Sequence, residues 1–182
     1  PPQVMNDWDD IPSKGINYVT SMSGRMSQEQ EKKSIAGYYA SVSFLDDQVG
    51  KVLKTLKEEG LEDNTIVIFT SDHGFHLGEH RFWMKVGLHE ESVRVPLIIK
   101  VPGKEPLKCN SFVELIDLYP SLADLGGLEV EQNVQGKSLK NTLDDPNYKL
   151  RDFAFSETQS GETFLIRTDK WAYIQYKIGD KI

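Results

Sequence analysis

One short segment of the sequence gathers side chains that could do chemistry together. Asp72 and His73 are adjacent and directly follow an apolar run of residues. A carboxylate and an imidazole held at the end of a rigid strand are suited to binding a metal ion. Gly74 and Gly78 permit tight turns or a close approach of the backbone at this place. The segment therefore predicts a metal or ligand site.

Other interpretations of this segment remain open on spacing alone. Asp-His-Gly after a strand is also typical of a turn in which Asp72 accepts a hydrogen bond from its own backbone. His76 and His80 stand four residues apart. They do not form the His-Glu-x-x-His pattern of zinc proteases, and Gly78 between them disfavours a helix, so we do not predict such a site.

Two further motifs fail as catalytic signals. Residues 135–138 read Gln-Gly-Lys-Ser, the end of a phosphate-binding loop, but the upstream glycine that this loop requires is replaced by Glu131. Cys109 is the single cysteine, so no disulfide can form within the chain. No paired base is visible beside it, and we do not predict a catalytic thiol.

Two apolar runs flank the candidate site. Residues 65–70 are a continuous β-branched and aromatic run, which is typical of a strand buried on both faces and hence of a central parallel strand. A second strand is expected over 95–101, where Pro102-Gly103 closes it. In open α/β sheets, ligands gather beyond the carboxyl ends of strands, and this is where Asp72 and His73 stand.

A long helix is expected before the first strand. Ser27 and Gln30 have the spacing of a capping box, and the periodic pattern ends at Gly60 after roughly 30 residues. The apolar stripe of this helix is predicted to be core. Its residues recur at steps of three and four: Ile35, Tyr38, Tyr39, Val42, Leu45, Val49, Val52, Leu53 and Leu56.

The C-terminal part of the sequence predicts one more helix and a small antiparallel unit. The helix spans Val113 to Leu125, with a break at Tyr119-Pro120 and a stop at Gly126-Gly127. The element order predicts part of an α/β sandwich, residues 1–150, with the start of an antiparallel subdomain, residues 151–182. Its short strands are expected at 153–156, 164–167 and 171–176, the last two joined by a hairpin at 168–170.

Composition excludes several classes of protein. Hydrophobic residues make up 38% and charged residues 27% of 182 residues, which is typical of a folded domain. A net charge of −7 argues against nucleic acid and anionic membrane surfaces as partners. No apolar run reaches the roughly 20 residues that a membrane span needs. Both ends lack the features of a natural terminus, so we expect a fragment of a longer protein.

The segment that follows the first strand resembles the sulfatase family of the alkaline-phosphatase superfamily. The Asp-His pair is most similar to the branch of iduronate-2-sulfatase and bacterial glycan sulfatases. The resemblance implies the C-terminal half of a formylglycine-dependent type I sulfatase. It is carried, in family order, by residues 66–74, 77–80, 83–85, 90–99, 101–103, 113–122, 136–139 and 166–171.

The resemblance implies roles for individual residues. Asp72 and His73 match two protein ligands of one Ca²⁺ ion. Lys85 matches a lysine that contacts the substrate sulfate, where an ammonium neutralises charge as the ester bond breaks; a solvated surface lysine is the alternative. His80 is expected near the site, as a catalytic group, a substrate contact or a support for other groups.

The remaining candidates are contacts to a sulfated carbohydrate or parts of the framework. Four side chains of the same segment are expected to bind substrate, although the last could equally be packing: Phe75, His76, Arg81 and Trp83. Glu90, Glu91 and Arg94 match the family as well, and we expect them to hold the loop rather than to react.

Other parts of the implied site are absent from this sequence. The family nucleophile is a formylglycine made from a Cys or Ser in a Cys/Ser-x-Pro/Ala-x-Arg signature, and the remaining metal ligands are paired aspartates after an apolar strand. Neither motif occurs, so the missing N-terminal half is the expected partner. The resemblance alone implies a periplasmic or secreted location.

Three functions are compatible with these observations. The first is hydrolysis of a sulfate ester on a saccharide. The second is a phosphoesterase or phosphonate hydrolase of the same superfamily, which usually needs more metal-binding His and Asp residues than this segment offers. The third is a non-catalytic structural or carbohydrate-binding fragment, since the isolated chain is expected to be inactive.

Overall fold

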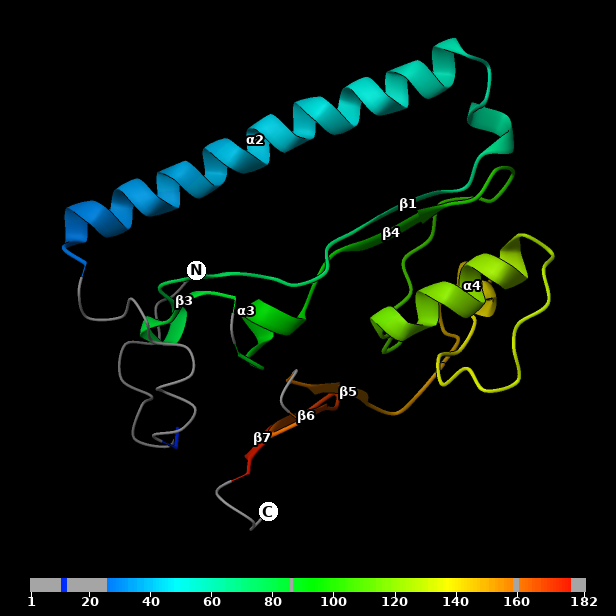
Figure 1. Ribbon diagram of the computed structural model, residues 1–182. Helices are drawn as coiled ribbons and strands as arrows, with labels where there is room; N and C mark the ends of the chain where they lie inside the picture. The colour runs from blue at the N-terminus through cyan, green and yellow to red at the C-terminus, as the bar shows by residue number, and fades with distance from the viewer. Residues whose placement is uncertain (1–10, 13–25, 86, 159–160, 178–182) are drawn as a thin grey trace. The chain divides into compact units, whose positions relative to one another are not determined.

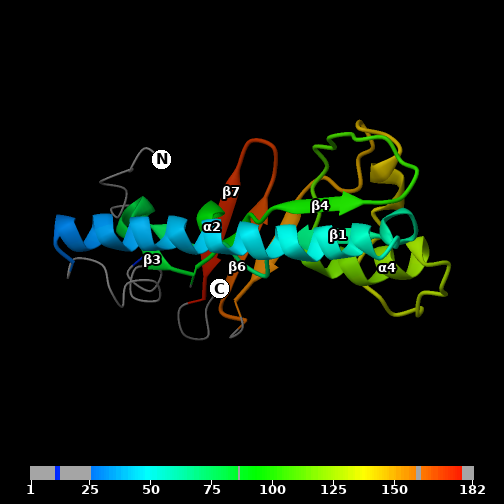
Figure 2. The same cartoon turned by 90° about the horizontal axis from the view of Figure 1, so that it is seen from above.

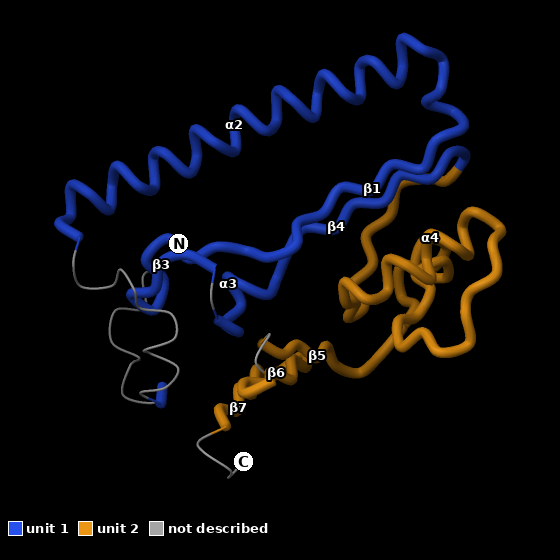
Figure 3. Tube along the Cα trace, in the orientation of Figure 1, with its two compact units in different colours: residues 1–103 blue, residues 104–182 orange. Residues whose placement is uncertain are grey.

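The computed structural model describes residues 11–12, 26–85, 87–158 and 161–177. The chain divides into two compact units, residues 1–103 and residues 104–182 (Figure 3). The expected boundary at 150/151 concerns a larger fold than this chain, so it stays a prediction. No helix in the described part is long and apolar enough to cross a membrane.

Helix α2, Gln28–Glu58, dominates the first unit (Figure 1). The predicted capping box is confirmed: Ser27 N donates to Gln30 Oε1 at 2.7 Å, and Gln30 N donates to Ser27 Oγ at 3.3 Å. These bonds satisfy amides that an α-helix leaves without partners at its start. The chain leaves the helix through Gly60, whose φ of 67° favours glycine.

The prediction that the stripe of α2 is core is wrong for the described chain. No residue of α2 is buried, and Leu45 and Val52 are 50% and 69% exposed. A helix of 31 residues is about 46 Å long. Strand β1, Val67–Thr70, extends over only about 13 Å. The first unit therefore contains too little partner surface to cover the helix.

Strand β1 pairs with β4, Leu97–Lys100, in a two-stranded sheet. Both strands were expected, but the predicted parallel, buried environment is wrong. The pair is antiparallel, with Phe69 opposite Ile98, and these two residues are 36% and 61% exposed. A continuous apolar run indicates which residues avoid water, but it carries no information about strand direction.

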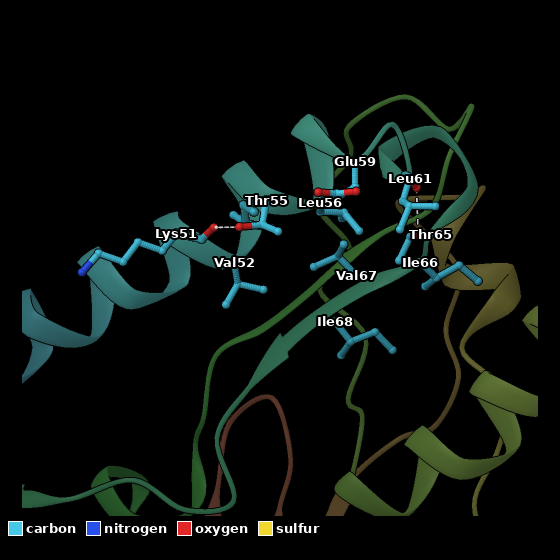
Figure 4. A pocket seen from close by; sticks show the side chains of 11 residues that line it. Lys51, Val52, Thr55, Leu56, Glu59, Leu61, Thr65, Ile66, Val67 and Ile68 are labelled. Atoms are coloured by element: carbon cyan, nitrogen blue, oxygen red, sulfur yellow. Dashed lines mark hydrogen bonds between the residues drawn. The ribbon is translucent and has the colours of Figure 1, made fainter.

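An apolar groove separates the C-terminal part of α2 from β1 (Figure 4). Figures 1 and 2 both show β1 running beside this part of the helix. Val52 and Leu56 face the groove from the helix, and Val67 faces it from the strand. The 3₁₀ turn η1, Glu62–Asn64, joins the two elements, and Glu62 binds Lys100 of β4 at 2.6 Å.

The segment between β1 and β4 contains four short elements. Strands β2, His76–Leu77, and β3, Trp83–Met84, form an antiparallel hairpin around the 3₁₀ turn η2, Glu79–Arg81. Helix α3, Glu90–Val93, follows and leads into β4. These elements position the candidate site.

The helical part of the second unit begins with the 3₁₀ turn η3, Leu115–Asp117, and continues as α4, Leu118–Leu125. The predicted break at Tyr119-Pro120 is wrong. Pro120 lies in the first turn of α4, where its missing N–H would have had no intrahelical partner. The predicted stop is confirmed, because Gly126 caps the helix and Gly127 has a φ of 69°.

The second unit ends in a three-stranded antiparallel sheet, after the 3₁₀ turn η4, Lys140–Leu143. The predicted hairpin is confirmed, since Arg167 pairs with Ala172 across a turn in which Thr168 N donates to Trp171 O at 2.8 Å. The strands are β5, Ala154–Glu157, β6, Thr163–Arg167, and β7, Ala172–Tyr176.

Candidate active site

The candidate site begins at the residues that directly follow β1. His73 Nδ1 lies 2.8 Å from the carbonyl oxygen of Gly74. A carbonyl oxygen can only accept, so Nδ1 carries the hydrogen and Nε2 keeps its lone pair. This contact fixes the tautomer that a metal ion or another cation needs at Nε2.

Two further predicted residues converge on the same nitrogen. Lys85 Nζ lies 2.9 Å from His73 Nε2, and Asp72 Oδ2 lies 3.5 Å from it. Asp72 also accepts a hydrogen bond from His73 N at 3.0 Å. The Asp72 side chain is 84% exposed and that of His73 is 34% exposed. The structure therefore brings three of the predicted site residues together at an open surface.

The donor atoms fit part of a cation site. A carboxylate and a neutral imidazole lone pair are suitable ligands, and the ammonium of Lys85 already occupies the direction of that lone pair. Among the described residues, no group of three or more His, Cys, Asp or Glu side chains could hold a metal ion. Asp72 and His73 would supply two ligands only.

Behind this pair lies a second group of side chains, which we call the histidine cluster. His80 Nε2 and His76 Nδ1 lie 3.5 and 3.9 Å from the same oxygen, Glu91 Oε2. The ring of Phe82 meets His76 edge to face at 5.6 Å, and His89 lies 4.8 Å from His80. The cluster consists of His76, His80, Phe82, His89 and Glu91.

His76 is a fully buried member of the histidine cluster. The residue is 0% exposed, and neither ring nitrogen has a hydrogen-bond partner. Burial, followed by the neighbouring charges of His89 and His80, lowers the pKa of His76 to about 4. The imidazole is therefore neutral at ordinary pH, because an uncompensated charge in this environment would be costly.

The other predicted substrate contacts lie in different environments. Phe75 stacks at a tilt on Tyr38 of α2, with ring centroids 5.3 Å apart, and Arg81 is exposed. Trp83 is only 6% exposed, which favours its packing interpretation. The burial of Trp83 and His76 weighs against direct contact with a substrate, although these roles stay predictions.

Gly74 allows the site segment to lie against α3. A Cβ atom at Gly74 would come 1.9 Å from the carbonyl oxygen of Glu91. Gly74 N also donates to Ser92 O at 2.8 Å. Gly78 is buried and has a φ of 111°, which a side chain would disfavour. The predicted need for glycine is therefore met by a close approach at one position and by a turn at the other.

Sequence reasoning missed the central place of Glu91. It was assigned to the framework, but its carboxylate lies between two of the histidines of the site segment. The only available signal was the density of His and Glu residues between 76 and 91. The contact between Lys85 and His73 was not predicted either, because no spacing rule joins residues 12 apart in a hairpin.

Comparison with protein families identifies the chain. The family model described as "Sulfatase" matches residues 11–128. A second model, "N-sulphoglucosamine sulphohydrolase, C-terminal", matches residues 78–181. The chain belongs to the sulfatase family, in agreement with the motifs around Asp72 and Lys85.

Curated relatives are sulfatases of greater length. The chain is 32% identical to arylsulfatase K of Bos taurus over 179 residues, which cover 91% of this chain and 33% of the relative. It is 33% identical to an arylsulfatase of Clostridium perfringens over 170 residues, which cover 89% of this chain and 35% of that relative. The chain thus spans about a third of the length of these relatives.

Solved structures share the fold. A 2-O GAG sulfatase matches with a TM-score of 0.77 and 26% identity, over 94% of this chain and 41% of its own. The phosphonate monoester hydrolase of Agrobacterium radiobacter matches with a TM-score of 0.74 and 28% identity, over 84% of this chain and 34% of its own. The mixed α/β architecture is therefore part of a sulfatase fold of the alkaline-phosphatase superfamily.

Proposed function

We propose that the full-length protein hydrolyses a sulfate ester on a saccharide, with the specificity of the iduronate-2-sulfatase branch. The observation that carries the proposal is the convergence of Asp72, His73 and Lys85. The Lys85 ammonium lies 2.9 Å from an imidazole nitrogen whose other side is fixed by a backbone carbonyl. This arrangement sits beyond the end of β1 in a chain of the sulfatase family.

Lys85 is assigned to the sulfate group of the substrate. Its side chain emerges directly after β3, on the exposed side of the hairpin. A sulfuryl group spreads negative charge over its oxygens as the ester bond breaks, and a nearby ammonium stabilises that charge electrostatically. In this state Lys85 would exchange its contact with His73 Nε2 for a sulfate oxygen.

Asp72 and His73 are assigned as two ligands of one Ca²⁺ ion. When bound, this ion would supply positive charge that binds and polarises the sulfate group. The chain's own residues hold the ligands in place: Gly74 O fixes the His73 tautomer, and the Gly74 amide anchors the segment to Ser92. The other ligands and a formylglycine nucleophile are assigned to residues outside this chain.

A second candidate is hydrolysis of a phosphonate or phosphate monoester. The similarity to the phosphonate monoester hydrolase of Agrobacterium radiobacter supports this alternative. Against it stands the small donor set of this chain, because no group of three or more metal-binding side chains occurs in its described residues. Substrate comparison separates the two candidates.

The test uses the full-length protein produced together with the formylglycine-generating system. Release of sulfate from sulfated glycosaminoglycan and algal saccharides is measured beside release from phosphate and phosphonate monoesters. We expect kcat/KM to be higher for a sulfated saccharide. Higher activity on phosphonate would support the second candidate, and no turnover with confirmed formylglycine and bound Ca²⁺ would support a binding protein.

A further inference from the structure

We propose that His76 is a positioning residue, whose buried ring, packed against Glu91, fixes the spacing between the Asp72–His73 pair and Lys85. The inference rests on the proposed function, since it concerns the same site. His76 touches neither the cation nor the sulfate group. It acts through the segment that carries the Asp72–His73 pair and Lys85.

The place of His76 in the hairpin links the two arms of the site. His76 follows His73 by three residues on β2. It stands opposite Met84 in the β2–β3 register, and Met84 directly precedes Lys85. A displacement of the His76 ring therefore moves the backbone of both β2 and β3. The contact between Lys85 Nζ and His73 Nε2 moves with them.

Helix α3 supplies the surface on which this hairpin rests. Gly74 lies against the Glu91 carbonyl oxygen and donates its amide hydrogen to Ser92 O. Two residues on, His76 Nδ1 faces the Glu91 carboxylate at 3.9 Å. The arm that carries Asp72 and His73 is thus fixed to α3 at its backbone and, through His76, at a side chain.

The polar atoms in this contact are not explained by packing. Both nitrogens of His76, Glu91 Oε2 and Ser92 Oγ are buried without a hydrogen-bond partner in the described part of the chain. A phenylalanine ring would fill the same space without burying polar atoms. Unpartnered buried polar groups are rare in stable folds, so each of them calls for a specific reason.

The charge state of His76 couples this contact to pH. The titratable groups that face the ring are His80 of η2, His89 at the start of α3, and Glu91 within α3. Burial keeps the ring neutral until the pH approaches 4. Protonation then draws the ring toward the Glu91 carboxylate and shifts β2, so the site loses its geometry on the acid side.

The experiment compares His76→Phe with His76→Asn in the full-length protein. Phenylalanine retains the ring volume, whereas the asparagine amide nitrogen can take the place of Nδ1 beside Glu91. The measurements are the thermal midpoint, Ca²⁺ affinity by titration calorimetry, and kcat and KM for sulfate release between pH 4 and 8. Leu165→Val is the control, because Leu165 is 2% exposed in the other unit.

We expect His76→Phe to keep its thermal midpoint while Ca²⁺ affinity and kcat each fall about tenfold and KM changes less. His76→Asn should recover part of both losses. The Leu165→Val control should lower the midpoint and leave Ca²⁺ affinity unchanged. A His76→Phe protein with wild-type affinity and kcat would show that the ring only packs and would overturn the proposal.

Failure of the proposed function gives a different pattern. If the wild type binds Ca²⁺ but releases no sulfate, the function fails and Ca²⁺ affinity alone decides the role of His76. A wild type that binds no Ca²⁺ has no ligand pair to position, and the proposal falls with it. If His76→Phe does not fold, the Ca²⁺ affinity of His76→Asn decides. A loss of affinity of up to about tenfold relative to wild type supports the positioning role, and an unchanged affinity overturns it.

Discussion

Two carboxylates of this chain, one fully buried and one partly buried, have opposite surroundings. Asp117 in the second unit is 0% exposed, and Arg151 binds both its oxygens at 2.7 and 2.8 Å. The amides of Lys137 and Glu114 each donate to it at 2.8 Å. Glu91 in the first unit faces two imidazoles at 3.5 and 3.9 Å, and its buried Oε2 has no hydrogen-bond partner.

The difference separates a structural cluster from a site cluster. Around Asp117 every lone-pair direction is used, so the cluster fixes η3, the loop at Lys137 and the chain before β5 in one arrangement. Around Glu91 polar atoms are left over beside a loop that carries the candidate active site. Incomplete hydrogen bonding is costly, and it leaves the histidine cluster able to respond to protonation or to a ligand.

The largest expected effect comes from breaking the complete cluster. Arg151→Ala leaves the buried Asp117 carboxylate without its charged partner, and such losses cost about 3–5 kcal/mol of the free energy of unfolding. Urea unfolding of the full-length protein measures this change. Arg151→Lys keeps the charge but loses the paired geometry, so its free energy of unfolding should lie between those of wild type and Arg151→Ala. A loss below about 1 kcal/mol would show that Asp117 is not a buried structural charge.

A smaller effect is expected where the site segment rests on α3. Gly74→Ala places a Cβ 1.9 Å from the Glu91 carbonyl oxygen, so the backbone must shift, at a cost of about 1–3 kcal/mol. Gly37→Ala is the matched control, because nothing lies within 4 Å of its added Cβ. Because Gly37 lies in helix α2, Gly37→Ala should raise the free energy of unfolding by about 0.5–1 kcal/mol. Equal effects at the two glycines would remove the argument for a close approach.

The effect that is smallest at neutral pH concerns His76, because it appears only as the pH falls. His76 has a pKa of about 4 in the folded protein, lowered from 6.5. The unfolded chain therefore binds a proton first, and this residue makes the free energy of unfolding fall as pH falls from about 6.5 toward 4. His76→Phe should flatten that part of the stability curve and leave the curve above pH 7 parallel to wild type. An unchanged slope between pH 6.5 and 4 would show that His76 titrates normally.

Local patterns in the sequence were reliable guides to local structure. The capping box at Ser27, the stop after α4 and the turn from Thr168 to Trp171 each depend on residues within a few positions of one another. The adjacency of Asp72 and His73 at a strand end likewise needs no tertiary information. Such features follow from backbone geometry alone.

Features set by distant partners were not predictable in the same way. The direction of β1 depends on its pairing with β4 across 30 residues, and the exposure of α2 depends on what else is present to cover it. The burial of His76 and the central place of Glu91 depend on how the hairpin folds onto α3. The resemblance to sulfatases supplied roles for Asp72 and Lys85 that spacing alone left open.

The most direct test of the central claim compares Lys85→Ala and Asp72→Asn with two exposed controls, Lys54→Ala and Asp63→Asn, in the full-length protein. The measurement is kcat/KM for sulfate release from the best sulfated saccharide. We expect each site variant to lose about 100-fold or more, since each removes charge stabilisation at the reacting group, while the controls stay within about twofold of wild type. Site variants that retain wild-type kcat/KM would contradict the assignment of this strand end as the active site.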